Sequence, residues 1–236
     1  MKSSNWSVAM VIGLALAAGA APALSGADNR PFTQDFRQEE CTFSSAGSTP
    51  YFILEPGYQT VFEGVEGKTA VVNTITVLRS TRRVDGVETR IVQERETHDG
   101  ELVEISMNYF AICSPNNSVF YFGEDVDIYE GGVIVSHEGA WRAGSNGARA
   151  GIVMPGIVLL GSRYFQEVAP GVALDRAEIV SMSEVVQTPA GVFEKCVKAD
   201  ETTPLEPNAR ESKFYAPGVG LVQDDTLFLV RYGFVR

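Results

Sequence analysis

Residues 69–111 read TAVVNTITVLRSTRRVDGVETRIVQERETHDGELVEISMNYFA, and this stretch decides the fold. Two turn signals, Asp85-Gly86 and Asp99-Gly100, divide it into three segments in which apolar and polar residues alternate. Asp-Gly between alternating segments is the strongest short-range signal of a β-hairpin, because both residues accept the left-handed conformation that a tight hairpin turn requires. The stretch therefore predicts an antiparallel meander of three strands, at residues 68–79, 88–97 and 101–111.

Alternation is clearest in the third of these strands. One face carries Val103, Ile105, Met107 and Tyr109, and the other carries Glu104, Ser106 and Asn108. The second strand is heavily charged, and its polar residues predict that one of its faces lies in solvent.

Short strands and turn signals continue along the rest of the chain. Further strands are expected at residues 58–63, 119–122, 127–129, 133–136, 162–168, 178–186, 192–199, 212–215 and 227–235. The Gly-rich segment 139–151 reads as a loop, 152–156 as a short turn and 169–176 as the one candidate for a helical turn. Roughly ten strands at this spacing are typical of sandwiches and barrels. We expect an all-β, mainly antiparallel domain with few short helices, built as a strongly curved sheet, a β-clam or a half-open barrel.

The N-terminus has the pattern of a secretory signal peptide. Lys2 precedes an apolar run, 8–21, that is too short to span a membrane, and small residues favour cleavage after Ala23 or Ala27. The expected organisation is a signal peptide at 1–27, a flexible arm at 28–50 and a single β domain at 51–236. No cysteine directly follows the apolar run and no later segment approaches the ~20 apolar residues of a membrane span. The prediction is a periplasmic or secreted protein without a lipid anchor or transmembrane span.

Charge and cysteine content limit the partners and the compartment. The net charge of −11 would repel nucleic acid and anionic membranes, while cations and basic partners are allowed. The sequence does not indicate an oligomeric state. An exported chain with three cysteines is expected to form one disulfide, and the settings of Cys41 and Cys113 at exposed segment ends favour that pair. Cys196 lies inside the expected strand 192–199 and reads as a buried apolar residue.

The densest group of candidate functional residues lies between 121 and 138. Glu124, Asp125 and Asp127 are candidate metal ligands, because oxygen-rich loops hold Ca²⁺. Their spacing is not that of an EF-hand, so a solvated acidic hairpin is the simpler interpretation and no cofactor is predicted. His137 and Glu138 could act as a general base and acid. No nucleophile elbow, phosphate loop or dinucleotide fingerprint accompanies them.

Six motifs, in order, resemble a group of exported bacterial proteins. They are YFGEDV (121–126), VSHEGAW (135–141), GIVMP (151–155), PAGVF (189–193), TPLEP (203–207) and YAPGVG (215–220). The PAGVF and YAPGVG motifs are similar to turns of exported β-clam proteins, and this resemblance implies a sheet that holds a ligand but no particular reaction. The chain departs from the group at residues 113–115, where related sequences have a polar Asp/Gly turn.

These observations lead to three functional hypotheses. The first is an exported, non-enzymatic β-clam protein that binds a small or lipidic ligand, or a cation. The second is a metal-assisted or carboxylate-based hydrolase that uses Glu124, His137 and Glu138, with Glu201 or Glu211. The third is an envelope structural or partner-binding module without a pocket. The expected ligand-binding residues are Tyr121, Glu124, Asp125, His137, Glu138, Trp141, Met154, Glu206 and Tyr215.

Overall fold

The computed structural model describes residues 30–235, which form a nearly closed antiparallel barrel. Strands make up 67% of the structure and helix 1%, which confirms the all-β class. The expected signal peptide, residues 1–27, lies outside the described residues. No helix in the described part of the chain is long and apolar enough to cross a membrane.

A 16-stranded sheet forms the barrel within these residues. Its longer strands are β4 (Tyr58–Glu66), β5 (Thr69–Val84), β6 (Val87–His98), β7 (Glu101–Cys113), β8 (Ser118–Glu130), β14 (Arg176–Thr188), β15 (Gly191–Thr203), β16 (Glu206–Ala216) and β18 (Leu227–Phe234). The shorter ones are β1 (Phe43–Ser44), β9 (Val133–Ser136), β10 (Trp141–Arg142), β11 (Arg149–Met154), β12 (Arg163–Phe165), β13 (Glu167–Val168) and β17 (Gly220–Asp224).

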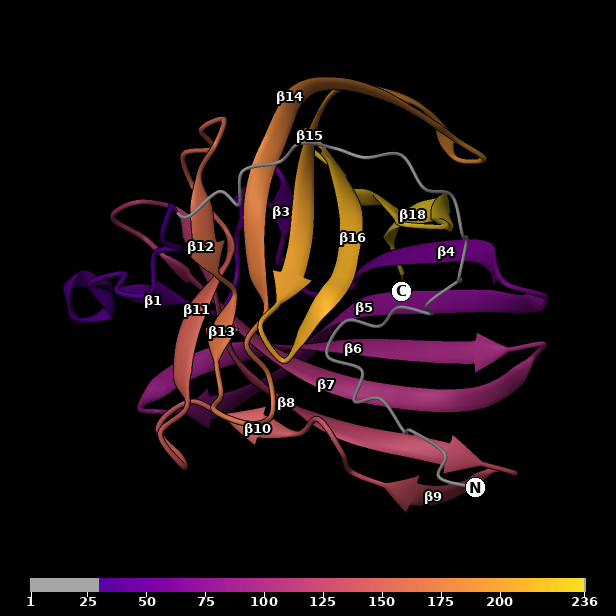
Figure 1. Cartoon of the computed structure of the whole chain (residues 1–236), viewed down its shortest axis with the longest axis horizontal. Helices are drawn as coiled ribbons and strands as arrows, with labels where there is room; N and C mark the ends of the chain where they lie inside the picture. Colours follow the sequence, from indigo (N-terminus) through magenta and orange to yellow (C-terminus); the bar gives the residue numbers. More distant parts are fainter. Residues whose placement is uncertain (1–29, 236) are drawn as a thin grey trace.

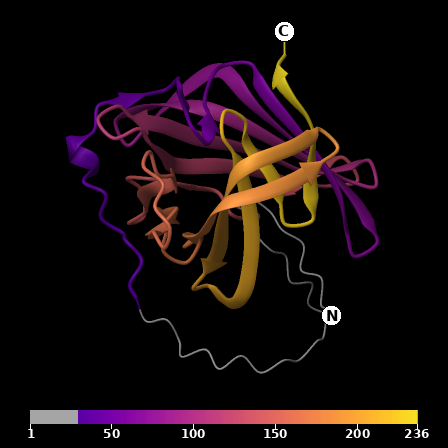
Figure 2. The same cartoon turned by 90° about the horizontal axis from the view of Figure 1, so that it is seen from above.

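Hydrogen bonding runs along the path β12-β14-β15-β16-β17-β18-β4-β5-β6-β7-β8-β11-β13. The two ends of this path meet, because β11 contacts β12. Figure 1 shows the right-hand strands β4 to β9 and the upper strands β14 to β16 as two walls of one curved sheet. Seen from above in Figure 2, the strands curl round a common axis, and the β14–β15 hairpin reaches over one side.

Both Asp-Gly hairpins form as predicted. Asp85 and Gly86 have φ values of 46° and 78°, and Asp99 and Gly100 have 48° and 86°. Positive φ at both central residues is the requirement of the turn whose twist matches that of paired strands. The meander of β5, β6 and β7 is therefore confirmed, with β5 extended beyond the expected strand to Val84.

The segment expected as a flexible arm packs on the barrel. A 3₁₀ turn, η1 (Gln38–Glu40), precedes β1, which pairs with the end of β7. The hairpin of β2 (Ser48–Thr49) and β3 (Phe52–Ile53) follows. Aromatic contacts of Phe36 and Phe43 with Phe120 add apolar packing. Residues 30–50 are thus part of the fold rather than a separate arm.

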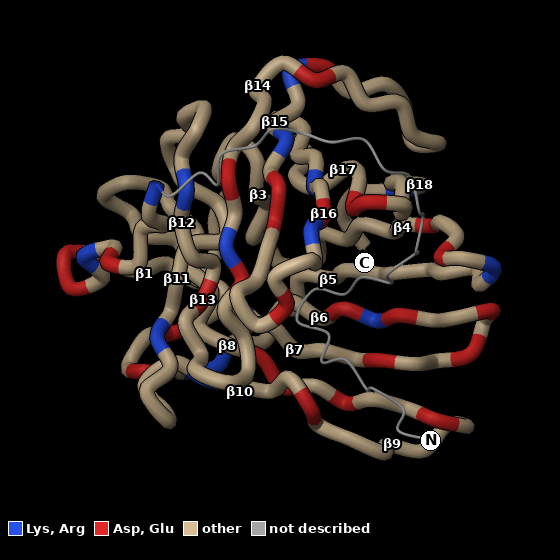
Figure 3. The backbone as a smooth tube through the Cα atoms, in the orientation of Figure 1, with Lys and Arg blue, Asp and Glu red and all other residues tan. Residues whose placement is uncertain are grey.

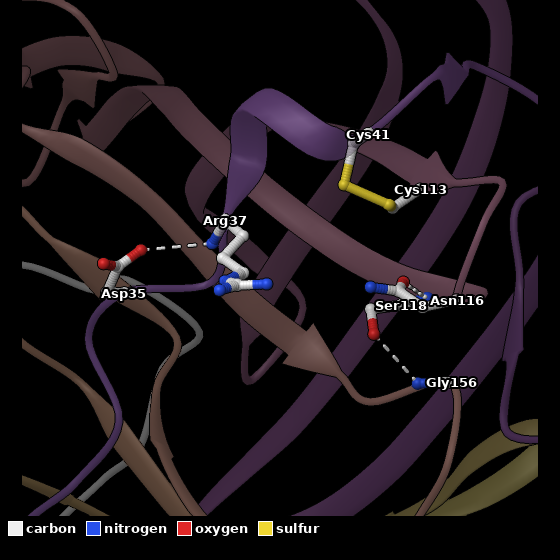
Figure 4. Close-up of a disulfide and its surroundings, with 7 residues drawn as sticks. All are labelled: Asp35, Arg37, Cys41, Cys113, Asn116, Ser118 and Gly156. Carbon is white, nitrogen blue, oxygen red and sulfur yellow. Dashed lines mark hydrogen bonds between the residues drawn. A yellow bond between two sulfur atoms is a disulfide. The ribbon is translucent and has the colours of Figure 1, made fainter.

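A disulfide between Cys41 and Cys113 fixes this segment, as predicted (Figure 4). The turn after Cys113 is closed by side chains: the Asn116 carboxamide oxygen accepts the Ser118 amide proton at 2.9 Å, and the Ser118 hydroxyl accepts that of Gly156 at 3.2 Å. Cys196 is free and fully buried, in agreement with its expected place in the core.

Other local expectations need correction. Residues 152–156 were expected to form a short turn, but most of them belong to β11, which pairs with β8. The expected loop 139–151 contains β10, whose Trp141 lies opposite Glu124. Gly123 makes this approach feasible, because a Cβ there would lie 2.3 Å from the Trp141 carbonyl oxygen. Residues 169–176 were the candidate for a helical turn. Residues 169–173 instead form a tight turn that is closed by hydrogen bonds between Ala169 and Ala173.

Candidate functional site

The barrel interior is unusually rich in acidic side chains. One face of β6 was expected to lie in solvent, and Arg95 is exposed there, whereas Glu94 and Glu96 on the other face are buried. On β7 the polar face of the alternation is the buried one, since Glu104, Ser106 and Asn108 are each less than 9% exposed. Acidic residues also outnumber basic ones along β6, β7 and β8 (Figure 3). Strand pairing brings these inward-facing residues into rows across the sheet.

The strand register places two pairs of these polar residues directly opposite each other. Glu96 on β6 lies opposite Glu104 on β7, and Asn108 on β7 lies opposite Glu124 on β8. Glu124 is 0% exposed and Tyr121, on the same strand, is also buried. The Tyr121 hydroxyl donates to the Asn108 carboxamide oxygen at 2.6 Å. One wall of the interior is therefore polar over three neighbouring strands.

The opposite wall holds a fully buried lysine. Lys213 on β16 places its Nζ 3.0 Å from Glu201 Oε2 on β15 and 3.7 Å from Asp224 Oδ2 on β17. Burial lowers the pKa of Lys213, but Asp224 and Glu201 outweigh this effect and hold the pKa well above its usual 10.5. Lys213 therefore stays charged, and its charge is shared between these two carboxylates.

A third group of polar residues lies near the closure of the sheet. The Gln166 amide donates to Glu201 Oε1 at 2.8 Å, and Glu167 Oε1 accepts the Asp175 backbone N–H at 2.5 Å. Gln166 and Glu167 lie at β13, at one end of the hydrogen-bonded path. Side-chain hydrogen bonds thus connect this end of the path with β15 across the interior.

Burial and mutual repulsion raise the pKa values of the interior acids. The pKa of Glu104 is raised to about 9 by burial and then by Glu96 and Glu94. Burial raises the pKa of Glu211 to about 9, and that of Asp224 to about 7 although Lys213 opposes the shift. The pKa of Glu124 is raised well above its usual value by burial, then by Glu104 and Glu94. Much of this interior is consequently protonated at neutral pH.

An apolar cavity of about 60 Å³ adjoins the acidic interior. One water needs about 10–15 Å³ of such space, so the cavity has room for a small organic molecule. Its apolar wall includes Phe52, Ile75, Val77, Val92, Phe110 and Leu221. Its polar groups come from Glu94, Tyr215, Thr60 and Tyr58, whose hydroxyl donates to the Val219 carbonyl oxygen. The cavity therefore has a mainly apolar wall to which a carboxyl group and phenol groups contribute.

The predicted ligand-binding residues are distributed over both faces of the sheet. Five are buried: Tyr121, Glu124, Trp141, Met154 and Tyr215. Tyr215 lines the cavity, and Trp141 packs edge-on against Tyr121 at 5.2 Å between ring centroids. Glu138 is exposed and Glu206 is half-buried at the start of β16.

The acidic candidates on β8 do not converge, because neighbouring residues of a strand point to opposite faces. Glu124 points inward. Asp125 lies on the other face, where it accepts hydrogen bonds from Arg82 at 2.9 Å and from the Tyr109 hydroxyl at 2.7 Å and pairs with Arg142. Asp127 lies 2.9 Å from His137 Nδ1. No three His, Cys, Asp or Glu side chains within residues 30–235 are arranged to hold a metal ion.

The hydrolase candidates are also separated. Glu124 is enclosed, whereas the His137 side chain is 68% exposed beside Asp127 and Glu138 follows it in a turn. Glu201 and Glu211 lie opposite each other on β15 and β16, near Lys213. The structure therefore groups Glu124, Glu201 and Glu211 with the interior and leaves His137 and Glu138 outside it.

Several interior residues were missed by sequence reasoning, namely Glu94, Glu96, Glu104, Lys213 and Asp224. The available signal was the period of two, since Glu94 and Glu96 share one face of β6 and Glu104, Ser106 and Asn108 share one face of β7. Alternation alone did not indicate that these polar rows lie in the interior. Scans of the chain against protein-family models, curated proteins and solved structures find no match.

Proposed function

We propose that this protein binds a small, mainly apolar molecule inside its barrel, in a compartment outside the cytoplasm. The observation that carries the proposal is the cavity of about 60 Å³ whose wall is mainly apolar, with polar groups from Glu94, Tyr215, Tyr58 and Thr60. Ligand sites are typically concave and apolar, with a few polar groups that orient the ligand. The Cys41–Cys113 disulfide supports the compartment, because disulfides persist where the environment is oxidising.

Binding is favoured over hydrolysis by the placement of the candidate catalytic groups. A general base must lie within hydrogen-bond reach of the proton that it removes, together with its partner groups. Glu124 is enclosed by the barrel, while His137 and Glu138 lie on its outside. The interior carboxyl groups accordingly serve in this proposal to hold and orient a ligand.

Benzene titrated into the processed protein tests the proposal, with binding followed by ligand-observed NMR. We expect saturable binding in the unmodified protein. Val77→Phe fills the cavity from β5 and should abolish binding, whereas Val133→Phe changes an exposed residue of β9 and should leave binding unchanged.

A cooperative thermal transition shows that each variant is folded. If Val77→Phe does not fold, Val153→Phe fills the same cavity from β11. Absence of saturable benzene binding, or equal binding by a folded cavity-filled variant, would refute the proposed function.

A further inference from the structure

We propose that the molecule bound in the cavity carries a protonated amine that contacts Glu94 and Tyr215, two of the residues that line it. This inference rests on the proposed binding function and defines the chemical class of the ligand. It follows from three features of the interior: its balance of charge, its unsatisfied polar atoms and the shape of the cavity wall.

The charge balance favours a cation. Glu94 lines the cavity and interacts electrostatically with Glu96, Glu104 and Glu124 on one side and with Lys213 on the other. Lys213 lies close to Glu201 and Asp224, so its charge is already shared between those two carboxylates. An anionic ligand would add to the repulsion, whereas a cation beside Glu94 would relieve it.

Unsatisfied polar atoms supply the second, independent observation. Tyr215 is 3% exposed and lines the cavity, and its hydroxyl has no hydrogen-bond partner among residues 30–235. The Glu124 carboxyl group has the Tyr121 hydroxyl as its hydrogen-bond partner, so Tyr215 alone supplies this observation.

An ammonium group on the ligand could form hydrogen bonds with Glu94 and Tyr215. Buried polar atoms are normally hydrogen-bonded, and an unsatisfied one destabilises the fold. A primary ammonium provides three N–H donors for the Glu94 carboxyl group and the Tyr215 phenol oxygen. Burial raises the pKa of Glu94, and a cation beside it would favour the ionised carboxylate. Glu94 and Tyr215 are the groups that the ligand would contact.

The wall of the cavity favours an organic cation over a metal ion. Hard metal cations require several oxygen ligands, and the described residues contain no such convergent set. The remaining wall is apolar, with Phe52, Val77 and Phe110 among its members. An alkylamine satisfies both halves of the site, because its chain contacts the apolar wall and its ammonium reaches Glu94.

Comparison of n-butylamine with 1-butanol tests this inference, because the two probes have the same chain length and differ in head-group charge. We expect n-butylamine to bind the unmodified protein at neutral pH at least about tenfold more tightly than 1-butanol, as for a hydrogen bond to a charged group. Glu94→Gln should weaken n-butylamine binding about tenfold and change 1-butanol binding by less than about threefold. Tyr215→Phe, which retains the ring, should weaken n-butylamine binding by a smaller factor.

Glu101→Gln is the matched control, because it removes one negative charge from an exposed position of β7. It should leave both affinities unchanged, and an effect equal to that of Glu94→Gln would show general attraction to an acidic protein and overturn the inference.

Equal binding of the two probes would also overturn it, while saturable benzene binding would leave the proposed function intact. Failure of benzene to bind would instead reject that function. If Glu94→Gln does not fold, the probe comparison in the unmodified protein and in Tyr215→Phe still decides.

Discussion

Glu96 and Glu104 lie directly opposite each other on β6 and β7, both on the buried face of the sheet. Like charges in such a cross-strand pair destabilise a sheet. Glu96 has a partner in His98, whose Nε2 lies 2.7 Å from its Oε1. The pKa of Glu104 is raised by burial, Glu96 and Glu94 to about 9, so Glu104 keeps its proton at neutral pH. The fold tolerates this acidic interior because part of it is uncharged.

This protonation predicts that stability falls as the pH rises. The pKa of Glu104 is about 9 in the folded protein, against its ordinary value of 4.5. The folded state therefore binds more protons between these values, so the contribution of Glu104 is fully present below 4.5 and is lost as the pH rises through 9. The slope is at most about 1.4 kcal/mol per pH unit for one such group. Urea unfolding at a series of pH values measures it.

Glu104→Gln provides the matched variant for this prediction. An amide cannot ionise, so the variant should be more stable than the unmodified protein at about pH 8 and should show a shallower decline from about pH 5. The pKa of Glu211 is also raised to about 9, so the stability of the variant should still decline with pH, but less steeply. Parallel stability curves for the two proteins would contradict the assignment of this slope to Glu104.

Replacement of Lys213 should be strongly destabilising. Lys213→Met removes the charge close to Glu201 and Asp224 and leaves both carboxylates uncompensated. Breaking a buried ion pair in this way costs about 3–5 kcal/mol. Lys68→Met, at an exposed turn position, is the control and should cost less than about 0.5 kcal/mol. Chemical unfolding measures both, and a similar small cost for the two variants would argue against a structural role of Lys213.

The Cys41–Cys113 disulfide should contribute substantially to stability. It joins residues 72 positions apart and ties η1 and β1 to the end of β7. The double variant Cys41→Ser/Cys113→Ser should lose about 2–4 kcal/mol of unfolding free energy. A thiol reductant should destabilise the unmodified protein but not this variant, and equal sensitivity of both would disprove a stabilising role.

Gly123 should be required by the contact between β8 and β10. Its φ is +129°, and a Cβ there would lie 2.3 Å from the Trp141 carbonyl oxygen. Gly132→Ala is the control, because its φ of +79° gives backbone strain with no atom within 4 Å. The backbone strain of an alanine at positive φ costs about 1–2 kcal/mol by itself. Gly123→Ala should exceed the control by at least about 1 kcal/mol in the free energy of unfolding, as for other overpacked sites. Equal losses would show that the close approach is not limiting.

The fold was predictable where local chemistry determines it. The turns at Asp85-Gly86 and Asp99-Gly100 require positive φ values that few residues adopt, and they set the register of the meander. The Cys41–Cys113 pair followed from the setting of each cysteine at the end of a segment. β11 was harder to predict, because its short apolar run ends at Pro155 and resembles a turn.

The candidate site was less predictable, because its position depends on closure of the barrel. Alternation identifies two faces of a strand but does not say which one becomes the interior. Glu104, Ser106 and Asn108 were recognised as one face of their strand, but the pattern did not indicate that all three are buried. Lys213 and Glu94 are far apart in the sequence and come into electrostatic range only when the opposite walls face each other. Tyr215 was predicted as a ligand-binding residue, and its place in the cavity keeps that prediction open to test.

A crystal structure of the processed protein soaked with n-butylamine tests the central claim most directly. The account predicts electron density for the probe inside the barrel, with its alkyl chain against Val77 and Phe110 and its nitrogen within hydrogen-bond distance of the Glu94 carboxylate. An empty interior at saturating n-butylamine, or density confined to the outer surface, would contradict the assignment of the barrel interior as the binding site.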